Sequence, residues 1–183
     1  KAAVFSGTGQ VSDPQGARDS IIASFVERGG EIVADTVTNV NVGPPARVVL
    51  ASGTVRDADA LLVCAGAWSG RVMAMLGVRA PVIGERGYHV QSPETNWPQD
   101  LPTTVFAEHF VVLSRFTSGL RATSFVEFGS PDAPGDERKW RRLQMRLAGL
   151  GVKFSPTPQR WIGSRPSLPD FVPAIGRLER APN

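Results

Sequence analysis

The fold class rests on the stretch Leu61-Leu62-Val63-Cys64-Ala65-Gly66-Ala67-Trp68-Ser69. Residues 60–64 are continuously apolar, which is typical of a strand buried on both faces of a sheet. Small residues follow, and then a short helical pattern that contains Val72, Met73 and Leu76 and stops at Gly77. Strand, small-residue turn and helix together form a local architecture that lets a ligand approach backbone N–H groups.

The sequence before this stretch predicts one helix and several short strands. Asp13-Pro14 indicates a helix start, because Asp caps a helix well and Pro suits its first position. Apolar residues then recur at helical spacing until Gly29-Gly30, where the helix should end. Strands are expected at residues 31–42, 47–51 and 54–56, and a short hairpin is expected around residues 4–11.

The sequence after Gly77 predicts a strand-rich region with a covering helix. Strands are expected at residues 81–91, 105–114 and 119–128, the first of them interrupted at its two glycines, Gly84 and Gly87. A helix is expected over residues 134–150, because its apolar residues share one face and the opposite face is charged. This order of elements indicates a mixed α/β (α+β) fold with an antiparallel-rich sheet and covering helices.

A second informative stretch is Gly163-Ser164-Arg165-Pro166-Ser167-Leu168-Pro169-Asp170. Proline fixes φ and glycine permits close approach, so Arg165 is expected on a stiff and specially shaped backbone. A guanidinium in such a place is well suited to bind a carboxylate through two parallel hydrogen bonds. On local composition alone, the alternative is an irregular surface loop with Arg165 as a solvated charge.

Composition excludes several classes of function. The 183 residues carry a net charge of +3 with scattered basic residues, which does not suit a nucleic-acid surface. One cysteine and two histidines allow no internal disulfide and no zinc pattern, so no metal site is predicted. No apolar run is long enough to span a bilayer.

Known catalytic and phosphate-binding motifs are also missing. Gly7-Thr8-Gly9-Gln10-Val11-Ser12 lacks the third glycine of a dinucleotide fingerprint and is interpreted as a turn. There is no P-loop, no G-x-S-x-G elbow and no H-E-x-x-H motif. Nothing places a nucleophile near His89 or His109, so the sequence predicts no catalytic side chain.

Taken in order, three segments resemble the D-amino-acid oxidase superfamily of FAD-dependent oxidoreductases. They are residues 61–69, the stretch Glu85-Arg86-Gly87-Tyr88-His89-Val90, and the Arg165 segment. The resemblance covers almost the whole chain and is greatest to D-amino-acid dehydrogenases and their glycine-oxidase-like relatives. It implies that residues 61–69 are a strand–turn–helix piece of an FAD-binding Rossmann-like domain.

The resemblance also implies roles for individual residues. Arg165 matches the arginine that binds the substrate carboxylate. Phe110 stands where glycine-oxidase-like relatives place a tyrosine as the second carboxylate partner, so Tyr88 or His89 is the alternative source of that hydrogen bond. The residues implied to lie beside FAD are Val37, whose backbone would bind the adenine, with Ala65, Gly66, Trp68, Arg86 and Gly87.

The implied reaction is the oxidative deamination of a D-amino acid or a glycine-like amine. The Cα hydrogen leaves as hydride to FAD, and the imine hydrolyses to a 2-oxo acid and ammonia. Relatives that act on glycine, sarcosine, hydroxyproline or 2-hydroxy acids share these motifs, so the substrate stays open, as does the choice of oxygen or a quinone as electron acceptor. A cytoplasmic location is expected, with peripheral attachment to the inner membrane as the alternative.

The chain departs from the family pattern at both ends. It starts without Met, and neither the G-x-G-x-x-G strand nor the C-terminal glycine-rich segment is present. We therefore expect an internal fragment that binds FAD weakly or not at all, unlike its full-length parent. Its expected parts are a partial FAD-binding segment at residues 1–78, a substrate-domain sheet and helix at 79–160, and a return segment at 161–183. The alternative is a non-catalytic α/β domain or binding module.

Overall fold

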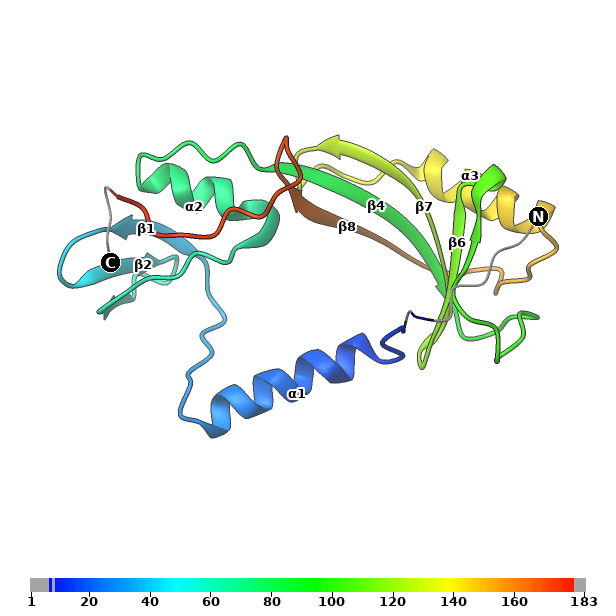
Figure 1. The fold of residues 1–183 in the computed structure, drawn as a ribbon, viewed down its shortest axis with the longest axis horizontal. Coiled ribbons are helices and arrows are strands. Elements are labelled where there is room, and N and C mark those ends of the chain that lie inside the picture. Colours follow the sequence, from blue (N-terminus) through cyan, green and yellow to red (C-terminus); the bar gives the residue numbers. More distant parts are fainter. Residues whose placement is uncertain (1–6, 8, 180–183) are drawn as a thin grey trace. The chain divides into compact units, whose positions relative to one another are not determined.

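The structure, a computed structural model, describes residues 7 and 9–179 (Figure 1). Residues 4–6 and 8 of the hairpin expected around residues 4–11 therefore lie outside the described residues. The strands of the chain form a three-stranded sheet of order β1-β2-β3 and a five-stranded sheet of order β5-β6-β7-β4-β8. The elements in chain order are α1 (Pro14–Glu27), β1 (Val37–Asn41), β2 (Ala46–Leu50), β3 (Val55–Ala58), η1 (Gly66–Trp68), α2 (Ser69–Met75), β4 (Ile83–Ser92), β5 (Thr104–Phe106), η2 (Ala107–His109), β6 (Val111–Phe116), β7 (Gly119–Gly129), α3 (Glu137–Gly149) and β8 (Gln159–Ser167).

The chain divides into two compact units, and neither is one continuous segment. The first unit contains the chain up to Glu31 together with Gly87–Phe125 and Gly135–Ile162. The second contains Ile32–Arg86, Val126–Pro134 and the chain from Gly163 onward. Strands β4, β7 and β8 contribute residues to both units. Because each unit has its own packing, each is described by itself.

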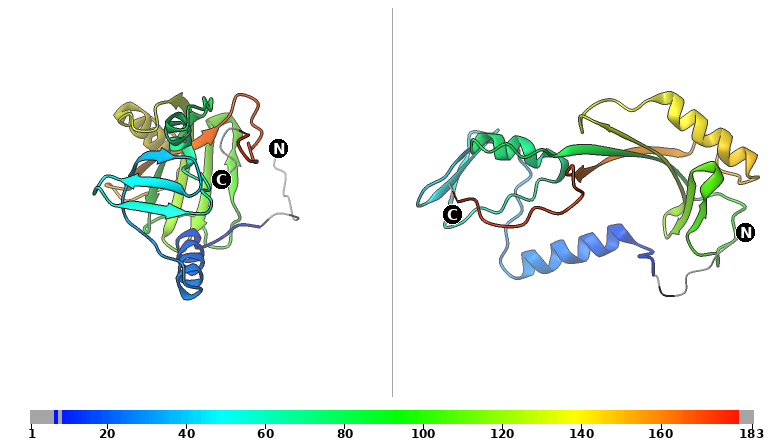
Figure 2. Two further views of the ribbon diagram at one scale, coloured as in Figure 1. Left: turned by 90° about the vertical axis from the view of Figure 1, so that its left-hand side faces the viewer. Right: turned by 45° about the horizontal axis from the view of Figure 1, so that its top comes forward.

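The first unit contains the main hydrophobic core. Strands β5, β6 and β7 pair antiparallel, with Ser114 opposite Arg121 and Thr104 opposite Leu113. Helix α3 covers one face of the sheet (Figures 1 and 2), as its apolar spacing predicts. The core between helix and sheet consists of Tyr88, Val90, Val111, Leu113, Leu120, Ala122, Trp140, Leu143, Leu147 and Val152.

Helix α1 confirms the predicted start and stop signals. The Asp13 carboxylate accepts a hydrogen bond from the Gly16 N–H at 2.9 Å, and Pro14 occupies the first helical position. Gly29 follows the helix with φ at +87°, a conformation that favours glycine. None of the side chains of this helix is buried, although Ile21 and Phe25 are apolar.

The second unit holds an antiparallel meander of three short strands. Val37 lies opposite Leu50, and Arg47 lies opposite Asp57, to which it is also ion-paired. These strands lie near the predicted places, although the first is limited to residues 37–41. Only a few apolar side chains of this unit are buried in the described part of the chain: Val40, Ala46, Leu50 and Ala67.

The predicted strand at residues 60–64 is wrong. These residues form neither strand nor bridge, and Leu62 is 84% exposed. An apolar run forms a doubly buried strand only where neighbouring strands supply its hydrogen-bond partners and cover both faces. No described residue pairs with this segment, so its apolar pattern has no sheet to join. The helix that follows is present, as α2.

Three further expectations are corrected by the structure. Strand β4 runs without a break, because Gly84 and Gly87 fit the extended backbone. The strand expected over residues 105–114 is divided into β5 and β6 by η2 and by Phe110, whose φ is +51°. The alternative of an irregular loop is wrong for residues 163–167 of the Arg165 segment: they form the second half of β8, an edge strand beside β4, and an edge position tolerates Pro166.

Candidate functional site

Arg165 lies on β8 in the second unit, and Glu85 of the neighbouring strand β4 binds its guanidinium. Nη1 of Arg165 donates to Oε1 of Glu85 at 3.1 Å, and the arginine side chain is 61% exposed. The second carboxylate oxygen, Oε2, accepts from the Ser167 hydroxyl at 2.7 Å. The remaining guanidinium nitrogens of Arg165 have no partner in the described part of the chain. They can therefore bind a carboxylate from a ligand.

Arg86 points to the opposite face of β4, where it is 5% exposed. Its Nη1 pairs with Oε1 of Glu127 at 2.9 Å, and its Nη2 donates to the carbonyl of Pro134 at 3.0 Å and to that of Ala133. These bonds connect β4 to the end of β7 and to the segment that follows it. The Nε of Arg86 is buried without a hydrogen-bond partner among the described residues. Arg86 is therefore engaged in holding the fold together.

The residues predicted beside FAD at the small-residue turn also lie in the second unit. Gly66 has φ at +55°, and nothing lies within 4 Å of the place where its Cβ would be. Trp68 is partly exposed, and its indole N–H donates to the Asp132 carboxylate at 2.8 Å. That bond, with the Arg71 guanidinium beside it, lowers the pKa of Asp132. Val37 begins β1 in the same unit.

Tyr88 is a core residue of the first unit. Its ring is fully buried and packs edge-to-face on Trp140, with ring centroids 5.0 Å apart. Its hydroxyl accepts a hydrogen bond from the Asp136 N–H at 3.0 Å, at the start of α3. The hydroxyl is thus already used within the protein, and a substrate contact from Tyr88 stays a prediction.

His89 faces away from that core, on the other side of β4. Its ring stacks on Trp161 with centroids 4.9 Å apart. Burial, and secondarily the positive charge of Arg121, lower the pKa of His89 from 6.5 to about 4. His89 is therefore neutral near pH 7 and can serve as a hydrogen-bonding group, not as a cation.

Phe110 lies in the first unit, between η2 and β6, and its side chain is 72% exposed. Its carbonyl accepts from the Ser124 hydroxyl at 2.6 Å, and that hydroxyl also accepts from Arg146 at 2.8 Å. The Arg146 guanidinium lies 5.9 Å from the Phe110 ring centroid and 4.5 Å from that of Phe125. A phenyl ring offers no hydroxyl, so Phe110 can provide only an apolar or cation–π contact.

The structure divides the predicted site residues between the two units. Arg165, Arg86 and the predicted cofactor residues Val37, Ala65, Gly66 and Trp68 belong to the second unit, whereas Gly87, Tyr88, His89 and Phe110 belong to the first. Within the second unit, the direct partners of Arg165 and Arg86 were not predicted. These partners are Glu85 and Ser167 for Arg165, and Glu127 for Arg86. Glu85 begins the Glu85–Val90 stretch, but no sequence pattern links it to Arg165, 80 residues later in the chain.

The residues present fit part of an FAD site. The space beside Gly66 is open and Ala65 and Gly66 are both only half-buried, so a ligand can approach the backbone at Gly66. The side-chain donors of Trp68 and Arg86 are instead used by Asp132 and Glu127. The backbone of the turn is thus open at Gly66, whereas these two side chains are engaged within the protein, and their contact with FAD stays a prediction.

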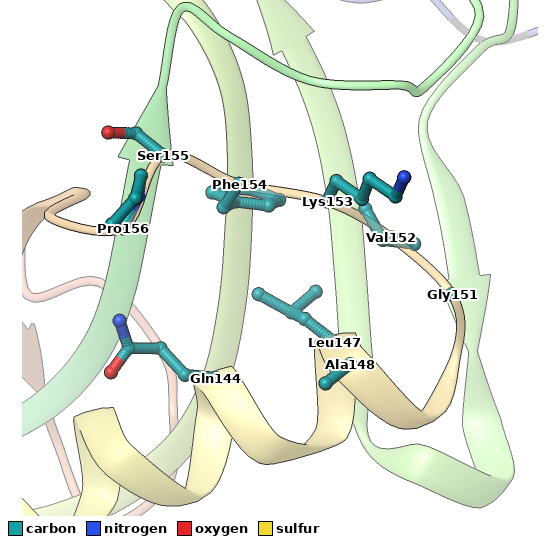
Figure 3. Close-up of a pocket in the computed structure, with 9 residues that line it drawn as sticks. All are labelled: Gln144, Leu147, Ala148, Gly151, Val152, Lys153, Phe154, Ser155 and Pro156. Carbon is teal, nitrogen blue, oxygen red and sulfur yellow. The ribbon is translucent and has the colours of Figure 1, made fainter.

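A hollow of about 500 Å³ lies elsewhere in the first unit, between the second half of α3 and residues 151–156 (Figure 3). Leu147 and Val152 line it, and both belong to the hydrophobic core. None of the predicted site residues reaches it. The described residues contain no cluster of potential metal ligands and no helix long and apolar enough to cross a membrane.

Comparison with known proteins identifies the class to which this fold and these motifs belong. The fold is mixed α/β with two antiparallel-rich sheets. The model of the family "DAO: FAD dependent oxidoreductase" matches residues 1–183. The chain therefore belongs to this family of FAD-dependent oxidoreductases.

Two curated relatives are similar in sequence. A D-amino-acid oxidase of Bradyrhizobium diazoefficiens is 29% identical over 184 residues, which cover 94% of this chain and 42% of that protein. An uncharacterized oxidoreductase of Halorhodospira halophila is 31% identical over 157 residues, which cover 81% of this chain and 71% of that protein. The chain thus spans less than half the length of the D-amino-acid oxidase.

Solved structures share the fold at low sequence identity. L-proline dehydrogenase from P. horikoshii superposes with a TM-score of 0.74 at 17% identity, over 93% of this chain and 48% of that chain. Iminodiacetate oxidase from Chelativorans sp. BNC1 gives 0.67 at 20% identity, over 90% and 46%. Glycine oxidase from Geobacillus kaustophilus gives 0.60 at 20% identity, over 80% and 40%. These likenesses support the mixed α/β fold.

Proposed function

We propose that this chain is part of an FAD-dependent enzyme that oxidatively deaminates a D-amino acid or a glycine-like amine. Family membership supports FAD chemistry, and the likeness to a D-amino-acid oxidase supports an amine substrate. The observation that carries the proposal is the exposed guanidinium of Arg165, which keeps hydrogen-bond donors free beside Glu85. Such a group selects substrates that carry a carboxylate next to the amine.

In the proposed mechanism, this chain positions the substrate. Arg165 binds the carboxylate through two parallel hydrogen bonds and so fixes the direction of the Cα–H bond. The accessible backbone at Ala65 and Gly66, together with Val37, would contact FAD. When bound, FAD supplies a hydride acceptor. The neutral amine loses one proton as its Cα–H electron pair departs, and water then converts the imine to a 2-oxo acid and ammonia.

The proposal is tested on the purified protein that contains this chain. We expect visible flavin absorbance that bleaches without oxygen on addition of D-alanine or glycine, with the 2-oxo acid and ammonia formed in equal amounts. Reoxidation by air, compared with reoxidation by a quinone, identifies the electron acceptor. A protein that never takes up FAD would instead support a non-catalytic α/β module.

The role of Arg165 has its own test. Arg165→Lys keeps the positive charge but removes the planar fork, so we expect KM to rise about 10- to 100-fold, the range for losing a charged hydrogen bond. Flavin content should be unchanged, because Arg165 is proposed to bind substrate and not FAD. The matched control is Arg160→Lys on the same strand, where the partner is the exposed Glu137. Equal KM values for Arg165→Lys and the unmodified protein would refute the carboxylate role.

A further inference from the structure

Glu85 has no role in the proposed reaction, yet both of its carboxylate oxygens are bound to β8. Oε1 accepts from Arg165 at 3.1 Å, and Oε2 accepts from Ser167 at 2.7 Å. Arg165 and Ser167 are two residues apart, so their side chains leave the same face of the strand. One carboxylate from β4 therefore links two side chains of the neighbouring edge strand.

This arrangement differs from an ordinary surface ion pair. The Glu85 side chain is only 18% exposed, and Ser167 is buried, whereas the Arg165 side chain is 61% exposed. In the pair of Arg160 with Glu137, by contrast, both side chains are well exposed, at 41% and 67%. A carboxylate shielded from water and hydrogen-bonded through both oxygens has one strongly favoured position. The position of the Glu85 carboxylate is thus fixed, and its hydrogen bond restricts the orientation of the more exposed Arg165 side chain.

The anchor leaves most of the guanidinium available. Glu85 engages one terminal nitrogen, Nη1, and a guanidinium has five N–H donors arranged as a fork. The edge formed by Nε and Nη2 can still make two parallel hydrogen bonds to a carboxylate. An arginine side chain that is already oriented loses less conformational entropy when a ligand binds.

We propose that Glu85 is a positioning residue, which holds Arg165 so that its free edge is presented to the substrate carboxylate. This inference rests on the proposed role of Arg165. It assigns Glu85 no contact with the substrate and no proton transfer. Its effect is on affinity for carboxylates, through the orientation of one side chain.

Two substitutions separate orientation from charge. Glu85→Ala removes both hydrogen bonds and should raise KM about 2- to 12-fold, the range for immobilising one flexible side chain on binding. Glu85→Gln should recover most of that loss. Its amide oxygen can still accept from Arg165, and its amide N–H can donate to the Ser167 hydroxyl, which is able to accept. The matched control is Glu137→Ala on α3. It removes the ion-pair partner of Arg160, which lies on β8 like Arg165, and it should leave KM unchanged.

Binding is also measured without turnover. Acetate, a carboxylate that cannot be oxidised as an amine, is titrated by calorimetry into the flavin-loaded protein and its variants. We expect Glu85→Ala to weaken acetate binding by the same 2- to 12-fold, with unchanged flavin content. The midpoint of thermal unfolding should fall, because this substitution leaves the buried Ser167 hydroxyl without its acceptor, whereas Glu85→Gln should retain most of it. In an Arg165→Lys background, Glu85→Ala should add little, because the fork that it orients is gone.

The outcomes separate this inference from the proposed function. Normal KM and acetate binding in Arg165→Lys would refute both. A raised KM in Arg165→Lys with normal values in Glu85→Ala would overturn only the role of Glu85. The inference is also overturned if Glu85→Gln is as impaired as Glu85→Ala, if the two substitutions are additive, or if acetate does not bind the unmodified protein.

Discussion

At the scale of single residues, His89 shows how position changes chemistry. The ring stacks on Trp161, and its burial, with a smaller contribution from the positive charge of Arg121, lowers the pKa of His89 from 6.5 to about 4. Both causes disfavour the protonated form. His89 therefore stays neutral at physiological pH and offers a hydrogen-bonding group without a charge.

The lowered pKa of His89 makes a prediction for stability. Between about pH 6.5 and pH 4 the unfolded chain binds a proton that folded His89 does not, so the free energy of unfolding should fall as pH falls through this window. Above pH 6.5 the contribution is constant. His89→Gln should reduce this pH dependence, whereas His109→Gln, at an exposed position, should retain it. The measurement is urea unfolding at pH 7.0 and pH 4.5, and an unchanged pH dependence in His89→Gln would contradict the prediction.

At the scale of elements, local signals predicted the helices well. The Asp13-Pro14 start of α1 and the apolar spacing of α3 were confirmed, because capping and periodicity act within one or two turns. The strands depended on distant partners. Residues 60–64 have the composition of a buried strand but pair with no strand in the part of the chain that the structure describes, and β8 has the composition of a loop but joins β4.

The candidate site was predictable to the same extent. Motif order selected Arg165 and the Ala65–Gly66 turn as candidates, because those signals lie within short stretches, and their roles stay predictions. Neither Glu85 as the partner of Arg165 nor Glu127 as the partner of Arg86 was foreseen. Such pairs depend on which strands become neighbours and on which face each side chain leaves its strand. A short stretch of sequence contains no information on which strands become neighbours or on which faces of two strands meet.

Helix α3 offers a direct test of the core. Leu143 is fully buried against the sheet, whereas Met145, two residues later, is 62% exposed. Leu143→Ala should lower the free energy of unfolding by about 2–5 kcal/mol through lost burial and a cavity, and Met145→Ala should change it by less than about 0.5 kcal/mol. Chemical denaturation of the two variants measures both. Equal losses would mean that α3 does not pack as described.

At the scale of the whole molecule, the hydrophobic core is unevenly distributed. The ten residues of the main core cluster all belong to the first unit. In the second unit, apolar side chains such as Leu62, Val126 and Ile175 are more than half exposed. Burial of apolar surface is the principal source of folding free energy, so the two units should differ in local stability.

Amide hydrogen exchange should reveal this difference. We expect the slowest exchange in β6, in the first half of β7 and in α3, where the backbone lies against the core. The amides of β1, β2 and β3 should exchange faster, because that sheet buries few side chains. Leu143→Ala should then accelerate exchange in the slow group while leaving the rates in β1–β3 nearly unchanged, and Met145→Ala should affect neither group. If Leu143→Ala accelerated every amide equally, the chain would unfold as one cooperative body, and the separate stability of the two units would be refuted.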